Sequence, residues 1–245
     1  MQPTTPTHPH SRAHVMAAWG VHVYTALGLA LGLASLDALW RQDAANFLLF
    51  NLLAVFIDGS DGTLARKLRV KEVVPFDGAL LDNIADYLTY VFLPAAGFVA
   101  FGLLPGPWRW AAMAPVLASG YQFCQERAKT DESFVGFPSY WNLVLLYLLV
   151  LQPSAPVTAG ILMVLSVLVF VPIHYLYPSR TRMWRPMTVF LGLIWFAACL
   201  AVGMNLEASW SRPVALASLS YIAYYLVMSG VLHRRITREH SASDA

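Results

Sequence analysis

Two pairs of aspartates are the residues of this chain whose types and spacing are best suited to chemistry. Asp58 and Asp61 are three residues apart, and Asp82 and Asp86 are four residues apart. Either spacing places both carboxylates of a pair on one face of a helix. Four clustered negative charges between long apolar segments need a compensating cation. The pattern therefore predicts a divalent-metal site with Asp58, Asp61, Asp82 and Asp86 as ligands.

The residues around these aspartates indicate that the metal serves a substrate with phosphate groups. Mg²⁺ and Mn²⁺ prefer oxygen ligands and often bridge carboxylates to phosphates, and a pair of such ions shares several carboxylates. We therefore predict two divalent cations, Mg²⁺ or Mn²⁺, as cofactors. Arg66 offers a bidentate fork for phosphate oxygens, and the small residues Gly62 and Ala65 leave room for a nucleotide. A carboxylate close to an acceptor hydroxyl could take its proton.

Two simpler interpretations of the acidic motif stay open at this point. A single aspartate near a helix end is usually a cap or a solvated residue. A pair of aspartates inside a membrane could form the cation site of a transporter that performs no chemistry. Four acids at these spacings, together with the glycines and the Ala65-Arg66 dipeptide, favour an enzyme over both alternatives.

The composition is typical of a protein that crosses a membrane many times. Of the 245 residues, 58% are hydrophobic and 12% are charged, whereas soluble domains carry about 25% charged residues. A helix needs roughly 20 apolar residues to cross a bilayer. We therefore predict an all-α, polytopic membrane bundle of about eight transmembrane helices, at residues 15–36, 46–57 with an extension into the acidic motif, 80–104, 108–123, 139–151, 157–177, 186–204 and 213–232.

The distribution of lysine and arginine predicts which ends of these helices face the cytoplasm. With the N-terminus inside, thirteen of the sixteen basic residues fall in cytoplasmic segments, and Arg41, Arg109 and Arg212 fall outside. Positive charge accumulates on the cytoplasmic side of membrane proteins. We therefore expect both termini and the acidic motif on that side. An arrangement with six spans that lacks the last pair has the same orientation.

The chain is predicted to form one membrane domain at residues 15–232. Residues 1–14 are polar and predict a flexible N-terminal tail, and residues 233–245 predict a polar cytoplasmic C-terminal tail. The cysteines, Cys124 and Cys199, lie in apolar surroundings and have no spacing typical of disulfide frameworks or metal sites. A net charge of only +2 indicates no nucleic-acid partner.

The acidic motif resembles the signature of the CDP-alcohol phosphotransferase family. That signature reads Asp-x2-Asp-Gly-x2-Ala-Arg-xn-Gly-x3-Asp-x3-Asp. Its fixed positions are matched here by Asp58, Asp61, Gly62, Ala65, Arg66, Gly78, Asp82 and Asp86. In this family a CDP-linked lipid or alcohol reacts with a second alcohol and releases CMP. The resemblance implies the six-helix core of that family, here with two additional C-terminal helices.

The resemblance also implies roles for the residues of the motif. Asp58, Asp61 and Asp82 are expected to bind the metal ions. Asp86 is expected to complete the metal site and to act as general base on the acceptor hydroxyl. The residues expected to bind CDP are Asp61, Gly62, Ala65, Arg66 and Gly78. Because family members are commonly dimers, a homodimer is implied as well.

Further stretches are similar to the bacterial phosphatidylcholine synthase branch of this family, namely residues 21–26, 86–92 and 136–142. The spacer of eleven residues between Arg66 and Gly78 is longer than in most of the family and is typical of the same branch. The resemblance implies CDP-diacylglycerol and choline as substrates, in a multi-pass protein of the bacterial inner membrane whose active site faces the cytoplasm. The alternative is another acceptor: serine, glycerol phosphate or inositol phosphate.

Choline is a quaternary ammonium, which aromatic ring faces hold best, sometimes with a carboxylate nearby. The candidates for its contacts near the cytoplasmic side are Tyr87, Tyr121, Glu126, Tyr140, Trp141 and Asn142. Aromatic residues also form belts at the interfaces of most membrane proteins, so an interfacial role is the alternative for each of these rings.

Overall fold

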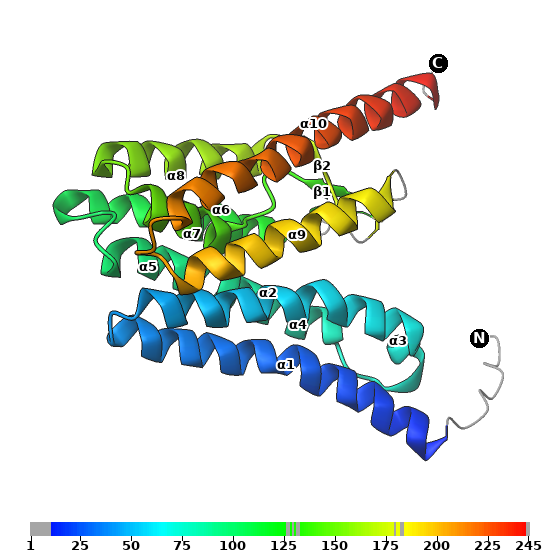
Figure 1. Ribbon diagram of the computed structural model, residues 1–245. Helices are drawn as coiled ribbons and strands as arrows, with labels where there is room; N and C mark the ends of the chain where they lie inside the picture. Colours follow the sequence, from blue (N-terminus) through cyan, green and yellow to red (C-terminus); the bar gives the residue numbers. More distant parts are fainter. Residues whose placement is uncertain are drawn as a thin grey trace.

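The computed structural model describes residues 11–243, except 126, 127, 129, 131, 132, 179, 182 and 183. This part of the chain is mostly helical (Figure 1). Its helical elements are α1 (Arg12–Trp40), α2 (Ala44–Lys67), α3 (Val70–Val73), α4 (Gly78–Asp86), the π-helix η1 (Tyr87–Phe92), α5 (Leu93–Ala100), the 3-10 helix η2 (Gly106–Ala112), α6 (Met113–Phe123), α7 (Trp141–Leu151), α8 (Ala155–Phe170), α9 (Arg185–Met204) and α10 (Ser211–Ser243). Two short strands, β1 (Ser133–Val135) and β2 (His174–Leu176), pair antiparallel.

Among the described residues, four helices are long and apolar enough to cross a membrane: α1, α2, α9 and α10. Helices α7 and α8 are apolar but shorter. Consecutive helical elements form two further rods, α4–η1–α5 and η2–α6. Each of the eight predicted spans therefore contains a helix, and the number of helices that cross the bilayer stays a prediction.

The basic segments share one end of the helical bundle. In Figure 1 the first turn of α1, helix α3, the β1–β2 ribbon and the last turns of α10 lie at the same end. The α1–α2, α7–α8 and α9–α10 turns lie at the opposite end. Residues 66–71 and 234–238, which hold seven of the basic residues, belong to the first end. Both ends of the described chain lie at this end of the bundle, and their cytoplasmic location stays a prediction.

The β1–β2 ribbon departs from the predicted all-helical chain. The predicted span 157–177 is wrong at its C-terminal end, because helix α8 stops at Phe170 and strand β2 follows. Pro172 explains the stop, since a proline disfavours helical backbone in the residue before it, and Val171 is extended. At the other terminus of the chain, residues 233–243 continue α10 where a polar tail was predicted.

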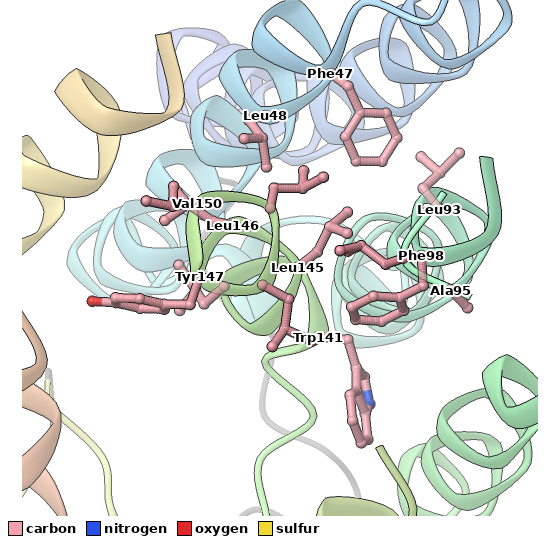
Figure 2. Packing of buried hydrophobic residues seen from close by; sticks show 14 of the residues in the cluster. Phe47, Leu48, Leu93, Ala95, Phe98, Trp141, Leu145, Leu146, Tyr147 and Val150 are labelled. Atoms are coloured by element: carbon pink, nitrogen blue, oxygen red, sulfur yellow. The ribbon is translucent and has the colours of Figure 1, made fainter. Parts of the chain in front are cut away.

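Helix α7 lies at the centre of the largest apolar core (Figure 2). Leu145 and Leu146 of α7 face Leu48 of α2 and Phe98 of α5, and all four side chains are almost fully buried. Gly97 permits this approach, because a Cβ there would lie 2.6 Å from Leu145 Cδ2. Within a lipid bilayer such close packing is the main source of attraction between helices. The core therefore fixes α2 relative to α5.

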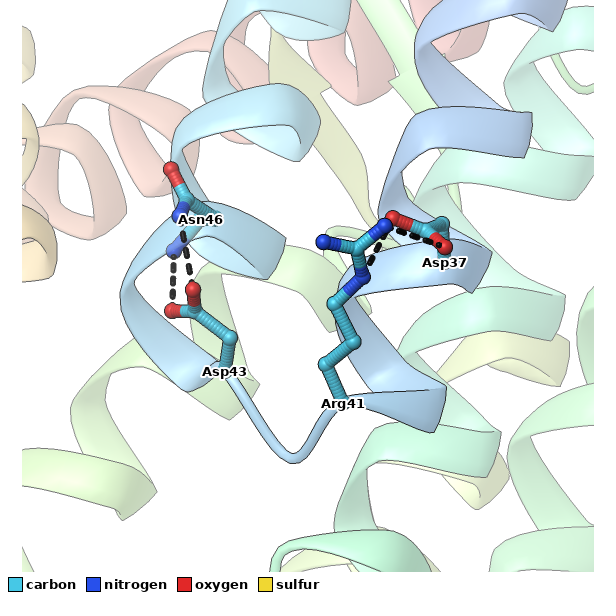
Figure 3. A network of polar contacts seen from close by, with 4 residues as sticks. All are labelled: Asp37, Arg41, Asp43 and Asn46. Atoms are coloured by element: carbon cyan, nitrogen blue, oxygen red, sulfur yellow. Dashed lines mark hydrogen bonds and ion pairs between the residues drawn. The ribbon is translucent and has the colours of Figure 1, made fainter.

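The α1–α2 turn places these two helices side by side (Figure 3). Arg41 pairs with Asp37, one turn earlier on α1, at 2.9 Å. Asp43 caps α2, where its carboxylate accepts hydrogen bonds from the Asn46 backbone N–H at 3.0 Å and the Asn46 side chain at 2.6 Å. These bonds to Asn46 lower the pKa of Asp43. The turn thereby sets the register at which α1 and α2 pack along their length.

A side chain at Gly136, which directly follows β1, is predicted to destabilise the folded protein. Its φ is +81°, and a Cβ at this position would lie 2.1 Å from the Val169 carbonyl oxygen. Gly136→Ala should therefore lower the thermal unfolding midpoint of the detergent-solubilised protein by about 5 °C or more. Gly160→Ala in α8 is the matched control, because nothing lies within 4 Å of the added methyl group. Equal midpoints for Gly136→Ala and the wild type would contradict the described ribbon.

Candidate active site

The structure brings three of the four predicted aspartates into one cluster. Asp58 lies on α2, and Asp82 and Asp86 lie on α4. One carboxylate oxygen from each of the three residues lies within 4.8 Å of the others. The four-residue spacing of Asp82 and Asp86 places both on the face of α4 that meets α2. Two helices therefore supply the cluster, as the spacing predicted.

Asp61 lies at the same recess but is held differently. It is 6% exposed, and its Oδ2 accepts a hydrogen bond of 2.7 Å from the Thr25 hydroxyl of α1. The recess is lined by Thr25, Gly28, Ala54, Ile57, Asp58, Asp61, Asp82, Ala85, Asp86 and Thr89. The four aspartates are the charged members of this lining, and several of the others are small. Thr25 was absent from the predicted site, although its place on an inward face of the first span could have suggested it.

Small residues of α1 allow α4 and η1 to approach it closely. A Cβ at Gly28 would lie 3.4 Å from Ala85 Cβ, and a Cβ at Gly32 would lie 2.8 Å from Leu88 Cδ2. A larger residue at Gly32 would therefore displace the Leu88 side chain of η1 from its place against α1. Since α4 and η1 form one continuous rod, this contact fixes the depth at which Asp82 and Asp86 lie beside Asp61.

The π-helix η1 follows Asp86 directly and directs Tyr90 to the cluster. Tyr90 is 5% exposed and donates a hydrogen bond of 2.8 Å to Asp58 Oδ2. Pro94 gives a physical reason for the wider turn, because its ring would clash with the Tyr90 carbonyl in a regular α-helix. Short π-helical turns are frequent at functional sites. Tyr90 was not predicted, although its position four residues after Asp86 is a usable signal.

The three clustered carboxylates fit a hard divalent cation. Mg²⁺ binds oxygen ligands at about 2.0–2.1 Å, so two ligands of one ion lie about 3–4 Å apart. A mutual separation within 4.8 Å meets this need after small side-chain movements. Three negative charges so close together also repel one another, which a bound cation would relieve. Tyr90 holds Asp58 and Thr25 holds Asp61, in each case through a hydrogen bond to Oδ2.

The predicted CDP-binding residues Gly62, Ala65 and Arg66 lie within about one turn of α2, and Arg66 is exposed. Its guanidinium donates to the Thr63 hydroxyl at 3.0 Å and lies over Gly62, where a Cβ would be 3.3 Å from its Nη1. Ala65 packs against the apolar cluster of Ala18, Val21, Val70 and Val74. Gly62 thus allows Arg66 to fold back along the helix, and Ala65 allows α1 and α3 to pack there.

Gly78, the remaining predicted CDP-binding residue, is in contact with a histidine. A Cβ at Gly78 would lie 2.7 Å from Cε1 and 3.0 Å from Nδ1 of His22. The glycine therefore makes room for an imidazole ring at the start of α4. His22 was not among the predicted site residues, and the spacing of the acidic motif carries no signal for it.

Three of the predicted choline contacts do not meet the aspartates in the described structure. Tyr87 donates to the Val116 carbonyl at 3.0 Å, and its ring contacts Phe123. Tyr121 is 52% exposed and its ring packs on Phe170. Trp141 is fully buried, and its indole N–H donates to the Ser119 hydroxyl at 2.8 Å. Glu126 lies outside the described residues.

Tyr140 and Asn142 are the remaining predicted choline contacts. The ring of Tyr140 lies 5.9 Å from the ring of Tyr90, the residue that bonds to Asp58. The ring of Phe134 of β1 lies 6.4 Å from that of Tyr140. Asn142 is 2% exposed, and its side-chain oxygen accepts a hydrogen bond from the Leu143 N–H. Tyr140 is therefore the predicted aromatic residue that the structure connects to the aspartate cluster.

Comparisons with known proteins agree with the resemblance seen in the motif. The family model described as CDP-alcohol phosphatidyltransferase matches residues 21–236. The chain is 37% identical to phosphatidylcholine synthase of Legionella pneumophila over 94% of its own length and 92% of the relative. It is 41% identical to phosphatidylcholine synthase of Pseudomonas aeruginosa, covering 73% of this chain and 76% of the relative. It is 34% identical to phosphatidylcholine synthase of Borreliella burgdorferi, over 88% of this chain and 93% of the relative.

The carboxylate cluster predicts a specific response to Mn²⁺. In the wild type, Mn²⁺ at about a hundred times its dissociation constant should stabilise the folded protein by about 2.7 kcal/mol, which raises the unfolding midpoint by about 5–10 °C. Asp82→Asn removes one of the repelling charges. It should raise the midpoint in EDTA and reduce the shift that Mn²⁺ causes. Fluorescence-monitored unfolding in detergent measures both effects.

Asp37→Asn is the control for this experiment. Asp37 is an exposed carboxylate that pairs with Arg41 at the C-terminal end of α1, away from the residues of α1 that line the recess. Its removal should leave the Mn²⁺ shift intact. An equal Mn²⁺ shift in Asp82→Asn and the wild type would show that the cation binds elsewhere.

Proposed function

The chain belongs to the CDP-alcohol phosphatidyltransferase family, and we propose that it transfers the phosphatidyl group of CDP-diacylglycerol to choline, giving phosphatidylcholine and CMP. The observation that carries this proposal is the cluster of Asp58, Asp82 and Asp86 within the family's motif. Relatives named phosphatidylcholine synthase, similar over most of the chain, support choline as the acceptor. The same chemistry with another acceptor is the alternative that the assay below separates.

The chain is a multi-pass membrane protein, as its apolar helices and its family indicate. We further propose eight crossings of a bacterial inner membrane, with the aspartate recess open to the cytoplasm. The shared end of the basic segments supports this orientation, because positive charge stays on the cytoplasmic side. Nucleotide-activated lipid is made on that side. Assembly as a homodimer stays a prediction of the family resemblance.

In the proposed mechanism the four aspartates bind metal ions, and one of them also accepts a proton. Asp58, Asp61 and Asp82, completed by Asp86, would hold two divalent cations, Mg²⁺ or Mn²⁺, whose charge would neutralise the CDP diphosphate and the leaving phosphate. Asp86 takes the proton from the choline hydroxyl. The choline oxygen then forms a bond to the phosphorus that bears diacylglycerol, and the bond between this phosphorus and the bridging oxygen breaks. That oxygen leaves with CMP.

The helical frame supports this division of roles. Asp86 is 7% exposed and ends α4 beside η1, so its carboxylate is shielded from bulk water. Thr25 orients Asp61, and Tyr90 orients Asp58, each through a hydrogen bond to Oδ2. Arg66, at the exposed end of α2, can bind phosphate oxygens of CDP with its guanidinium fork. Gly62 gives the Arg66 side chain room to lie along α2, and Gly78 gives His22 room at the start of α4.

For the acceptor site we propose that Tyr140, Tyr90 and Phe134 receive the quaternary ammonium. The ring centre of Tyr140 lies 5.9 Å from that of Tyr90 and 6.4 Å from that of Phe134. Ser139 holds Tyr140 in place, because its hydroxyl bonds to Ser119 at 2.8 Å and to Gln122 at 2.6 Å. Tyr90 donates a hydrogen bond to Asp58, so an ammonium group at these rings would leave the hydroxyl end of choline close to the aspartates.

A direct assay tests the proposed reaction. Membranes that contain the protein should form labelled phosphatidylcholine from CDP-diacylglycerol and labelled choline in the presence of Mn²⁺ or Mg²⁺, and release CMP in equal amount. Asp86→Asn should reduce this rate at least about a hundred-fold, because general-base catalysis contributes that much. Labelled serine, glycerol phosphate and inositol phosphate are the comparison acceptors. Product from one of these, but none from choline, would contradict the proposal.

The proposed acceptor site makes a separate prediction about KM. Tyr140→Ala should raise the KM for choline by about 3- to 30-fold, the range expected for loss of a cation–π contact. The KM for CDP-diacylglycerol should change little, and Tyr140→Phe should retain near-wild-type values because the ring remains. If both variants leave the KM for choline unchanged, Tyr140 does not contact the ammonium.

A further inference from the structure

His22 is a buried histidine without a hydrogen-bond partner for its Nε2 among the described residues. The side chain is 7% exposed, and the Nε2 atom itself is buried. Buried polar atoms in folded proteins are almost always paired, because an unpaired one loses its bonds to water without replacement. The missing partner of His22 is therefore a property that needs an explanation.

His22 lies about one turn of α1 away from Thr25, which lines the aspartate recess. Thr25, which donates to Asp61, is three residues later on the same face of α1, about 4.5 Å along the helix axis. Gly78, which touches the imidazole, is four residues before Asp82 on α4. Helices α1 and α4 run in the same direction, since His22 meets Gly78 and Gly28 meets Ala85. His22 therefore lies at the same α1–α4 interface as the recess, about one helical turn away from it.

The imidazole ring is held in one place by its neighbours. Gly78 lies against the Cε1–Nδ1 edge, and the ring centre of Phe76 is 4.6 Å away. The ring of Trp19 meets the imidazole edge-on at 5.7 Å. Trp19 and Phe76 are 45% and 41% exposed, so they form an aromatic rim outside the histidine. A polar group fixed behind an aromatic rim is suited to bind a nucleoside, whose base stacks and whose polar atoms form hydrogen bonds.

We propose that His22 Nε2 forms a hydrogen bond with the nucleoside part of the CDP group. This inference rests on the proposed function, because it takes CDP-diacylglycerol as the lipid substrate. The cations at the aspartates hold the diphosphate, and the cytidine extends past Thr25 towards His22, Trp19 and Phe76. Gly78 serves this contact indirectly, because any larger residue would displace the imidazole. His22 is thus a substrate-binding residue outside the acidic motif.

The simpler explanation is that His22 only packs against aromatic neighbours. Two substitutions separate the explanations. His22→Phe retains a planar ring of similar size and removes the hydrogen-bonding nitrogen. His22→Gln places an amide nitrogen near the position of Nε2 and removes the ring. A packing role predicts that Phe is tolerated better than Gln, whereas a binding role predicts the reverse order.

The test measures binding of two ligands to the full-length protein in nanodiscs at fixed free Mn²⁺. CDP contains the nucleoside and the diphosphate, and pyrophosphate contains the diphosphate alone. His22→Phe should weaken CDP binding by about 5- to 100-fold, the range for leaving a polar group unpaired. Its affinity for pyrophosphate should stay within about two-fold of the wild type, and His22→Gln should recover much of the CDP affinity. Val23→Ala is the control, because Val23 is 61% exposed on the neighbouring face of α1.

The outcomes distinguish this inference from the proposed function. Wild-type affinity of His22→Phe for CDP would overturn the inference, and so would an equal loss of CDP and pyrophosphate binding. A wild-type protein that binds CDP but forms no phosphatidylcholine would overturn the proposed acceptor and leave the His22 contact standing. The unfolding midpoint of each variant, measured without ligand, identifies any variant whose loss of binding reflects misfolding.

Discussion

The mutual repulsion of Asp58, Asp82 and Asp86 is the constraint on which the rest of the structure depends. Carboxylates within 4.8 Å of one another favour separation unless protons, hydrogen-bond donors or cations offset their charge. The protein supplies one donor to Asp58 from Tyr90 and one to the neighbouring Asp61 from Thr25. These neutral hydroxyls orient the carboxylates but add no positive charge. The divalent cation that we propose at these carboxylates would offset their mutual repulsion.

The cluster holds together because the packing around it resists that repulsion. Gly32 lets the α4–η1 rod approach α1, and Gly97 lets Leu145 of α7 lock α5 against α2. Pro94 accounts for the π-helical turn that directs Tyr90 towards Asp58. In the proposed mechanism this turn links the two substrate sites, since Asp86 directly precedes it and Tyr90 within it lies near Tyr140. The proposed general base and one of the proposed acceptor-binding residues therefore lie on one short stretch of continuous helix.

Much of this arrangement was predictable from the sequence, because local spacing determines it. The aspartate spacings predicted the shared helix faces, and the apolar runs predicted where helices would lie. The rest depends on contacts between distant segments. Residue spacing in the sequence does not predict that Trp141 is buried in the core, or that Gly78 accommodates His22. The ribbon was missed because its strands are only three residues long, although Pro172 marked the end of α8.

The central claim is that the clustered aspartates bind the cation that serves phosphatidyl transfer. Anomalous diffraction at the manganese absorption edge, from crystals grown with Mn²⁺ and CDP, tests this most directly. The account predicts a manganese peak among the carboxylates of Asp58, Asp82 and Asp86, in contact with the CDP diphosphate. A structure with CDP bound and no manganese at these carboxylates, or with manganese bound elsewhere, would contradict it.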